Sequence, residues 1–420
     1  MDKFLVRGGA TLHGTVQISG AKNATLALMP AALLSGGTYR FANTPALRDV
    51  NTMAMLLRTM GVQVELADHT LTLDTRTVTS LEAPYEHVKK MRASIYVLGP
   101  LLARYNRARV SLPGGCAWGP RPVNLHLEGM RTLGAQIELE RGYIVARTDG
   151  LRGARVHFDV SSVGATGNVM MAAVLARGTT VIENAALEPE ISFLAETLRS
   201  MGAQIDGIGT TRLEIQGVKE LHPADVETIP DRIESGTFLV AAAITGGSVR
   251  LEHTAPQFLG AVLAKLEAAG CTITQGDDWV ALESPARLNS VDVTAEVYPG
   301  FPTDMQAQWT ALMALGSDSA LITDAIYPDR FKHVPELQRL GANIEVRKNA
   351  AVVRGVERLI GAKVMSTDLR GSASLILAGL VAEGTTEVLR VYHIDRGYEA
   401  IEKKLQFLGA DIERVAGEEF

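Results

Sequence analysis

Cys116 is the residue of this chain whose setting is best suited to chemistry. It lies in segment 113–122, ten residues that include three glycines and three prolines. Such a composition cannot form a helix or a central strand, so we predict a loop that presents the thiol. Arg121 follows in the same segment, and a nearby guanidinium lowers the pKa of a thiol and makes its sulfur reactive. The alternative is a turn in which the cysteine is incidental.

Three cationic side chains stand where apolar helices are predicted to begin. They are Lys22, which precedes Asn23, then Arg92 and Arg370. A helix N-terminus presents unpaired N–H groups and the positive end of the helix dipole, so a cation there is locally unfavourable. A solvated charge would explain any one of them. Three at equivalent positions of a repeat predict that an anion binds between them.

Asp304 begins another apolar helix, directly after Pro302 and Thr303. A carboxylate at this position is typical of an N-cap, and it is equally suited to act as a general base. The residues around Asp304 leave both interpretations open.

The second cysteine and the histidines give no sign of a metal site. Cys271 occupies a position where repeated copies of the same phrase carry valine or alanine, which predicts a buried small hydrophobic residue. The sequence has no CxxC or HExxH spacing, and its nine histidines are scattered. We therefore expect no metal site.

One phrase occurs six times in the chain: an amphipathic helix, a glycine, a small residue and the start of a strand. A glycine that ends a helix indicates a left-handed turn. Alanine-rich helices that are apolar nearly all round recur in most copies and should be buried. We therefore predict six α/β units, each with an inner and an outer helix. The six glycines, 68 to 73 residues apart, are Gly61, Gly134, Gly202, Gly270, Gly341 and Gly409.

The composition predicts a globular protein, and the six repeated units predict two lobes with three units each. The 420 residues are 46% hydrophobic and 21% charged, and a proline at position 230 interrupts the pattern near the middle. Apolar runs reach only about eight residues, short of the roughly 18 that a membrane span needs. The chain starts in a strand-like pattern without an apolar targeting segment, so we expect a cytoplasmic protein. The net charge of −6 disfavours a nucleic-acid scaffold.

Seven segments, in order from the first strand to the last, together resemble one known family. They include Gly20-Ala21-Lys22-Asn23 and Asp231-Arg232-Ile233-Glu234, and the set resembles the UDP-N-acetylglucosamine 1-carboxyvinyltransferases, which are enolpyruvyl transferases. The resemblance extends over essentially the whole chain. The segments are 18–24, 90–94, 112–116, 230–234, 301–308, 367–370 and 393–398.

The resemblance implies an α/β fold of two lobes, the inside-out α/β barrel of the enolpyruvyl transferases, with six repeated units and a substrate cleft between the lobes. Residues 22–229, with the Cys116 loop, would form the first lobe. Residues 1–21 would join 230–420 in the second.

The implied reaction transfers the enolpyruvyl group of phosphoenolpyruvate to the 3-hydroxyl of UDP-N-acetylglucosamine by addition and elimination, with release of phosphate. It is the first committed step of peptidoglycan synthesis and thus of cell wall biogenesis. Phosphoenolpyruvate carries a phosphate and a carboxylate on three carbons, so its pocket needs several fixed cations. The resemblance implies no metal, organic cofactor, nucleic acid, membrane or obligate protein partner.

The resemblance also implies a role for each matching residue. Cys116 would be the general acid and Asp304 the general base, with Lys22 and Asn23 completing the catalytic set. Phosphoenolpyruvate would contact Lys22, Asn23, Arg121, Arg330, Arg370 and Arg396. The sugar nucleotide would contact Arg92, Arg121, Pro122, Val123, Asn124, Leu125, Ser162, Val163, Gly164, Asp304 and Ile326. Residues that depart from those common in the family are Trp118, Pro120, Val160 and Pro328.

Three other functions are compatible with parts of the sequence. The sister enzyme, 3-phosphoshikimate 1-carboxyvinyltransferase, shares the fold and reaction type, but it typically has Gly-Ser-Lys-Ser where this chain has residues 20–23. A sixfold ring that encircles nucleic acid would need a basic lining and no cysteine loop. A catalytically silent sugar-nucleotide sensor would not need Lys22, Cys116 and Asp304 together.

We predict that Cys116→Asp retains part of the activity, with its optimum at lower pH, because a carboxyl group has a lower pKa than a thiol. Cys116→Ser should lower turnover by about 100-fold or more, since a hydroxyl is too weak an acid at neutral pH. Steady-state rates across pH test both variants. In the wild-type chain, the epoxide fosfomycin should alkylate Cys116 and leave Cys271 unmodified in a peptide map. Normal turnover by Cys116→Ser would mean that the acid lies elsewhere.

Overall fold

The computed structural model of this chain describes residues 2–112 and 123–416. They divide into two compact units, which we call the terminal unit (Met1–Ser19 with Pro230–Phe420) and the central unit (Gly20–Ile229). The chain thus passes from the terminal unit to the central unit after Ser19, whereas the family resemblance implied this crossing after residue 21. The predicted loop with Cys116, Arg121 and Pro122 lies outside the described residues.

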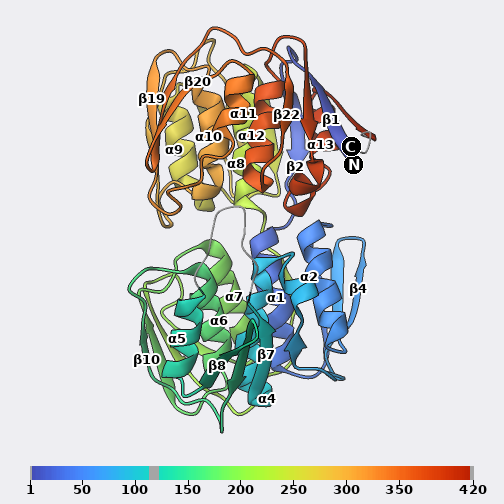
Figure 1. The fold of residues 1–420 in the computed structure, drawn as a ribbon, viewed down its shortest axis with the longest axis vertical. Coiled ribbons are helices and arrows are strands. Elements are labelled where there is room, and N and C mark those ends of the chain that lie inside the picture. The colour runs from blue at the N-terminus through green and yellow to red at the C-terminus, as the bar shows by residue number, and fades with distance from the viewer. Residues whose placement is uncertain (1, 113–122, 417–420) are drawn as a thin grey trace. The chain divides into compact units, whose positions relative to one another are not determined.

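The central unit carries the helices and strands of residues 22–227 (Figure 1). In chain order they are α1 (Lys22–Ala31), η1 (Ala32–Leu34), β3 (Thr38–Ala42), α2 (Arg48–Thr59), β4 (Gln63–Ala67), β5 (Thr70–Asp74), β6 (Glu82–Ala83), α3 (Tyr85–Val88), η2 (Arg92–Val97), α4 (Leu98–Tyr105), β7 (Arg107–Ser111), α5 (Asn124–Thr132), β8 (Gln136–Glu140), β9 (Tyr143–Arg147), β10 (Arg155–His157), α6 (Val163–Ala173), β11 (Thr179–Glu183), α7 (Pro189–Ser200), β12 (Gln204–Asp206), β13 (Arg212–Gln216) and β14 (Asp225–Glu227).

The terminal unit combines two strands from the start of the chain with the elements after residue 231. They are β1 (Asp2–Arg7), β2 (His13–Gln17), α8 (Arg232–Ile244), β15 (Ser248–Glu252), η3 (Pro256–Phe258), α9 (Gly260–Ala268), β16 (Thr272–Gln275), β17 (Trp279–Glu283), β18 (Val293–Ala295), η4 (Thr303–Met305), α10 (Gln306–Met313), β19 (Ser319–Asp324), α11 (Val334–Arg339), β20 (Asn343–Arg347), β21 (Ala350–Arg354), β22 (Lys363–Met365), α12 (Leu369–Gly379), β23 (Thr385–Leu389), η5 (Val391–Arg396), α13 (Ile401–Phe407) and β24 (Asp411–Ala416).

The described residues form six four-stranded sheets of one pattern, three in each unit. In each sheet an edge strand runs parallel to its neighbour, and the next two pairings are antiparallel. In one of them β18 pairs in parallel with β19, with Ala295 opposite Asp324, and β21 then pairs with both β19 and β20 in antiparallel. The prediction of six repeated α/β units is confirmed.

Strands from distant parts of the chain complete both units. β1 lies between β23 and β24, so that Leu5 is opposite Glu387 on one side and Glu413 on the other. In the central unit β14 pairs in parallel with β3, with Val226 opposite Phe41. In each unit, a strand from the start of the unit pairs with a strand near its end. This pairing links the first and last elements of the unit.

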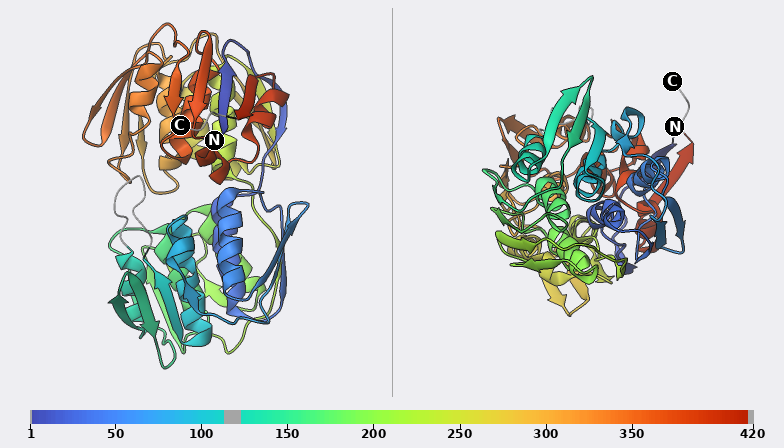
Figure 2. Two further views of the ribbon diagram at one scale, coloured as in Figure 1. Left: turned by 45° about the vertical axis from the view of Figure 1, so that its right-hand side comes forward. Right: turned by 90° about the horizontal axis from the view of Figure 1, so that it is seen from below.

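The inner helices are buried because they lack a polar face. In the terminal unit α8, α10 and α12 pack on one another (Figure 1), and all residues of α8 after Arg232 are buried. In the central unit α4 packs on α6, and α1 contacts η2, inside the sheets of that unit (Figure 2). The outer helices are amphipathic, as predicted: α2 buries Val50 and Met53 and exposes Asn51.

The six glycines of the repeated phrase all have positive φ angles, from 93° to 103°. This is the left-handed turn that the sequence predicted, and it stops each outer helix so that the following strand can join its sheet. Cys271 directly follows one of these glycines and is buried, as predicted, and burial raises the pKa of its thiol to about 11. No helix among the described residues is both long enough and apolar enough to span a membrane.

Gly134→Ala should lower the free energy of unfolding by about 1 kcal/mol, because its φ of 93° strains any residue with a Cβ atom. A Cβ at this position meets nothing within 4 Å, so the loss of stability measures the backbone strain without a steric clash. Gly260→Ala is the matched control, since its Cβ is equally unobstructed and it begins helix α9, which alanine favours. Urea unfolding measures both. Equal stability of the two variants would contradict this account of the turn.

Candidate functional site

In the terminal unit, Asp304 lies between two arginine side chains. One carboxylate oxygen is 2.7 Å from Nη2 of Arg330, and the other accepts a hydrogen bond of 2.9 Å from Nη2 of Arg370. Asp304 is in η4, which continues into the inner helix α10. The N-cap of η4 is Pro302, so the N-cap interpretation of Asp304 is wrong. The two guanidinium groups favour the ionised carboxylate, which is the form that can accept a proton.

Both arginines are held in fixed places by the fold. Arg370 is the second residue of α12, and the Asp368 carboxylate caps this helix by accepting hydrogen bonds from the backbone N–H groups of Arg370 and Gly371. Burial opposes the charge of Arg370, yet Asp304 and other acidic groups raise its pKa above the ordinary value. The Arg330 side chain is 8% exposed and that of Arg370 is 3% exposed, so both charges are largely removed from water.

The other predicted residues of this unit lie on neighbouring elements. Ile326 follows β19, and its backbone N–H donates to the Asp324 carboxylate at 3.0 Å. Arg396 is the last residue of η5, which packs against α12, and its side chain is half-buried. The described structure thus brings Asp304, Arg330 and Arg370 into direct contact and places Arg396 on an adjoining element.

In the central unit, Lys22 pairs with a carboxylate that sequence reasoning missed. Lys22 is the first residue of α1, as predicted, and its Nζ lies 3.5 Å from Oδ2 of Asp49 on α2. The Asp49 side chain is 4% exposed. An anion supplied by the protein therefore accompanies this helix-start cation, as Asp304 accompanies Arg370. The adjacent Asn23 is exposed.

The residues predicted to hold the sugar nucleotide lie at three further helix starts. Arg92 begins η2, and Val123 is the N-cap of α5, which begins at Asn124 and Leu125. Ser162 caps α6 by accepting a hydrogen bond of 3.3 Å from the N–H of Ala165, with Val163 and Gly164 in the first turn. These helix starts present N–H groups, which suit the phosphates of a nucleotide.

A buried amide ties these helix starts together. Asn168 of α6 accepts a hydrogen bond from the N–H of Gly99 at 2.7 Å and donates to the carbonyl of Ile95 at 2.9 Å. Its Nδ2 also lies 3.0 Å from Nδ1 of His126 on α5. A Cβ on Gly164 would meet the His126 ring at 3.0 Å, so the ring packs directly against the predicted nucleotide segment.

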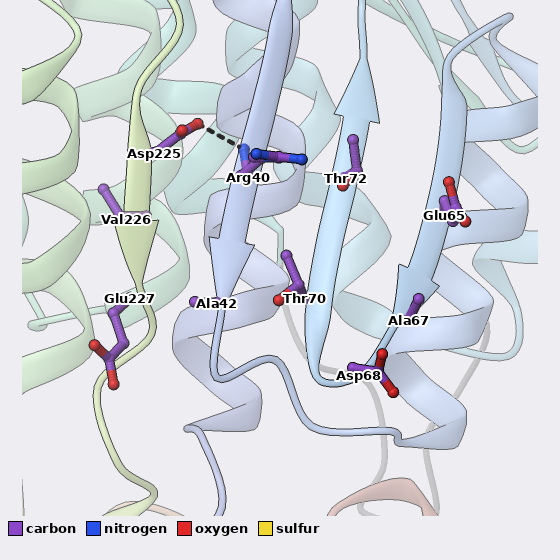
Figure 3. A pocket seen from close by; sticks show the side chains of 10 residues that line it. All are labelled: Arg40, Ala42, Glu65, Ala67, Asp68, Thr70, Thr72, Asp225, Val226 and Glu227. Carbon is purple, nitrogen blue, oxygen red and sulfur yellow. Dashed lines mark hydrogen bonds between the residues drawn. The ribbon is translucent and has the colours of Figure 1, made fainter.

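Two open hollows of the surface are lined by none of the predicted residues. The one in Figure 3 lies on the solvent side of the sheet of β14, β3, β5 and β4, where Arg40 and Thr72 point outward. Tyr39 and Phe41, which flank Arg40 on β3, point to the buried side. Within residues 2–112 and 123–416, no group of three or more histidine, cysteine, aspartate or glutamate side chains is arranged to hold a metal ion.

Comparison with known proteins agrees with the fold. Residues 6–405 match the EPSP synthase (3-phosphoshikimate 1-carboxyvinyltransferase) family. The chain is 58% identical, over 100% of both chains, to the UDP-N-acetylglucosamine 1-carboxyvinyltransferase of Chlorobium limicola, and 58% identical to that of Chloroherpeton thalassium over 100% of this chain and 99% of the relative. The chain belongs to the UDP-N-acetylglucosamine 1-carboxyvinyltransferase family.

Solved structures place this family within the wider enolpyruvyl transferase fold. The enolpyruvyl transferase NikO from Streptomyces tendae matches with a TM-score of 0.90 and 26% identity over 99% of both chains. An EPSP synthase from Acinetobacter baumannii matches with a TM-score of 0.76 at 18% identity, over 99% of this chain and 100% of the other, which shows the fold alone.

Sequence reasoning missed four buried residues beside the predicted site: Asp49, His126, Asn168 and Asp324. Asn168 gave a signal that could have been used, because it is a single amide within the otherwise apolar run of α6. Asp49 gave none, since it acts on a residue more than twenty positions away in the chain, and the contact of Asp324 with Thr303 also spans more than twenty positions.

We expect stability to fall as the pH drops from about 6.5 toward 4. Burial lowers the pKa of His126 to about 3 and that of His333 to about 4, from an ordinary 6.5. Above pH 6.5 both histidines are neutral in the folded and in the unfolded chain. Below pH 6.5 only the unfolded chain binds protons at these histidines, so each histidine lowers the free energy of unfolding by up to about 1.4 kcal/mol per pH unit. Urea unfolding at pH 7.5, 6 and 5 measures this slope.

His333→Gln should reduce the slope of stability against pH by nearly 1.4 kcal/mol per pH unit, the contribution of about one proton, whatever its effect on stability at pH 7.5. His13→Gln, at an exposed position of β2, is the matched control. Parallel slopes for wild type and His333→Gln would show that this histidine titrates normally in the folded chain.

Proposed function

We propose that this protein transfers the enolpyruvyl group of phosphoenolpyruvate to the 3-hydroxyl of UDP-N-acetylglucosamine and releases phosphate, the first committed step of peptidoglycan synthesis. The chain is 58% identical over its full length to a UDP-N-acetylglucosamine 1-carboxyvinyltransferase, which supports this reaction. The structural observation that carries it is the Asp304 carboxylate, held between Arg330 and Arg370 at the start of an inner helix.

Asp304 is suited to the role of general base on the sugar hydroxyl. Its side chain is 27% exposed, so it is reachable, while its two partners are nearly buried. In the addition step, the methylene carbon of phosphoenolpyruvate gains a proton and positive charge builds on the neighbouring carbon. The sugar oxygen bonds to that carbon as Asp304 takes the hydroxyl proton. Loss of a proton from the new methyl group then expels phosphate and restores the double bond.

The cationic residues are suited to the anionic substrates. Arg370 Nη1 is buried and has no hydrogen-bond partner among the described residues, so its guanidinium keeps one donor for a carboxylate or phosphate. Lys22, Arg330 and Arg396, with Arg121 outside the described residues, are the further cations that we assign to phosphoenolpyruvate. Asn23 would orient the tetrahedral intermediate. Cys116, also outside the described residues, is assigned the role of general acid.

The sugar nucleotide would bind at the helix starts of the central unit and at Asp304 and Ile326 of the terminal unit. Arg92, Val123 to Leu125, and Ser162 to Gly164 lie at the starts of η2, α5 and α6. The charges of both substrates prevent them from crossing a membrane unaided, so we propose that the enzyme works in the cytoplasm.

Phosphate release should require phosphoenolpyruvate and UDP-N-acetylglucosamine together and should persist in EDTA, because protein cations balance the substrate charges. A colorimetric phosphate assay with each substrate alone and with both tests this directly. Shikimate 3-phosphate in place of the sugar nucleotide distinguishes the sister activity. Loss of turnover in EDTA that returns with added Mg²⁺ would contradict the proposal.

Within the same assay, Asp304→Asn should lower kcat by about 100-fold or more, since an amide cannot accept the hydroxyl proton. Calorimetry should still detect binding of UDP-N-acetylglucosamine. The asparagine variant is preferable to alanine, because it retains a hydrogen-bond acceptor for one of the two nearly buried arginines.

A further inference from the structure

The carboxylate of Asp324 is enclosed at the end of β19, and it makes its hydrogen bonds to residues other than Asp304. Its side chain has no exposed surface. The sheet fixes its backbone: Ala295 of β18 is its partner in the parallel pairing, and its N–H donates to the carbonyl of Asn349 at 2.8 Å. Burial raises the pKa of Asp324, although hydrogen bonds to Thr303, Tyr327 and Ile326 oppose the shift. Burying a carboxylate is unfavourable unless its hydrogen bonds compensate.

The two oxygens of this carboxylate hold different parts of the unit. Oδ1 accepts from the backbone N–H groups of Ile326, at 3.0 Å, and Tyr327, at 2.7 Å. Oδ2 accepts from the hydroxyl of Thr303 at 2.6 Å. One oxygen therefore shapes the turn that follows β19, and the other acts on the residue that precedes Asp304.

The Thr303 hydroxyl connects Asp324 to Arg330. It donates its single proton to Asp324 and accepts a hydrogen bond of 3.0 Å from Nη1 of Arg330. Nη2 of the same guanidinium lies 2.7 Å from Oδ1 of Asp304. Because a hydroxyl has only one proton, the carboxylate of Asp324 keeps the lone pairs of Thr303 turned toward Arg330. Arg330 is thus held on two sides, by Asp304 and by Thr303.

We propose that Asp324 is a positioning residue for the enolpyruvyl transfer, which fixes Arg330 against Asp304 through the Thr303 hydroxyl and fixes the Ile326 turn through its backbone. The inference rests on the proposed function, in which Asp304 is the base and Ile326 contacts the sugar nucleotide. Asp324 itself touches neither Asp304 nor, in this scheme, the substrates.

The two tasks are separable by mutation. Thr303→Val removes only the hydroxyl, and Thr303→Ser restores it. Asp324→Asn keeps an oxygen for the Ile326 turn but presents an amide N–H₂ to Thr303, whereas Asp324→Ala loses both. Thr303→Val and Asp324→Asn should therefore act on catalysis, and Asp324→Ala should in addition weaken binding of the sugar nucleotide.

The test measures kcat and KM for both substrates by phosphate release, with melting temperature as a check of folding. Thr303→Val and Asp324→Asn should each lower kcat about tenfold or more, with the KM for UDP-N-acetylglucosamine within about twofold of wild type. Thr303→Ser should stay within about threefold of wild type. The double variant Thr303→Val with Asp324→Asn should be no slower than its slower parent, because both break one connection. Asp324→Ala should raise that KM as well.

Asp318→Asn is the matched control. Asp318 lies just before the same strand and accepts a hydrogen bond of 2.8 Å from the N–H of Ser319, but it is exposed. Its kcat should remain within about twofold of wild type. Wild-type kcat in Asp324→Asn, or additive losses in the double variant, would overturn the positioning role while the proposed function stands. A wild-type enzyme that releases no phosphate with both substrates would instead overturn the proposed function.

Discussion

Two nearly buried guanidinium groups that share one carboxylate are the interaction on which the terminal unit's site depends. A charge that leaves water must be paired and hydrogen-bonded, or the fold loses several kcal/mol. Asp304 therefore balances Arg330 and Arg370. The same need explains why Thr303 accepts a further hydrogen bond from Arg330, while Asp324 accepts the proton of the Thr303 hydroxyl. The arrangement that makes these cations tolerable also holds a carboxylate that solvent and substrates can reach.

The repeated architecture explains why the polar residues gather where they do. An inner helix packed on all sides has no polar face, so its charged side chains lie at its start. There the unpaired N–H groups require acceptors, and Ser162, Asp231 and Asp368 supply them as N-caps. Each repeat contributes one such start. The chemistry is thus built from the parts of the fold that cannot be apolar.

The solved structures show that this scaffold does not by itself decide the substrate. An EPSP synthase shares the fold at 18% identity, while the family members that share more than half of their residues carry one enzyme name. The difference between such enzymes must lie in side chains on a common framework. In this chain, the Asn168 and His126 pair sets how three helix starts of the central unit lie relative to one another. Such buried pairs connect the framework to its specific residues.

The sequence by itself determined the repeat, the left-handed glycine turns and the cations at the starts of α1, η2 and α12, because these depend on residues that are neighbours in the chain. The sequence left Asp304 open between a helix cap and a general base. Only the tertiary structure shows that Asp304 pairs with Arg330 and Arg370 and is not the N-cap. The contacts of Asp49 with Lys22, of Asn168 with Gly99 and of Asp324 with Thr303 could not be predicted, since each joins residues of different elements. Local spacing fixes helices and turns, but which buried charges meet is decided by how the units pack.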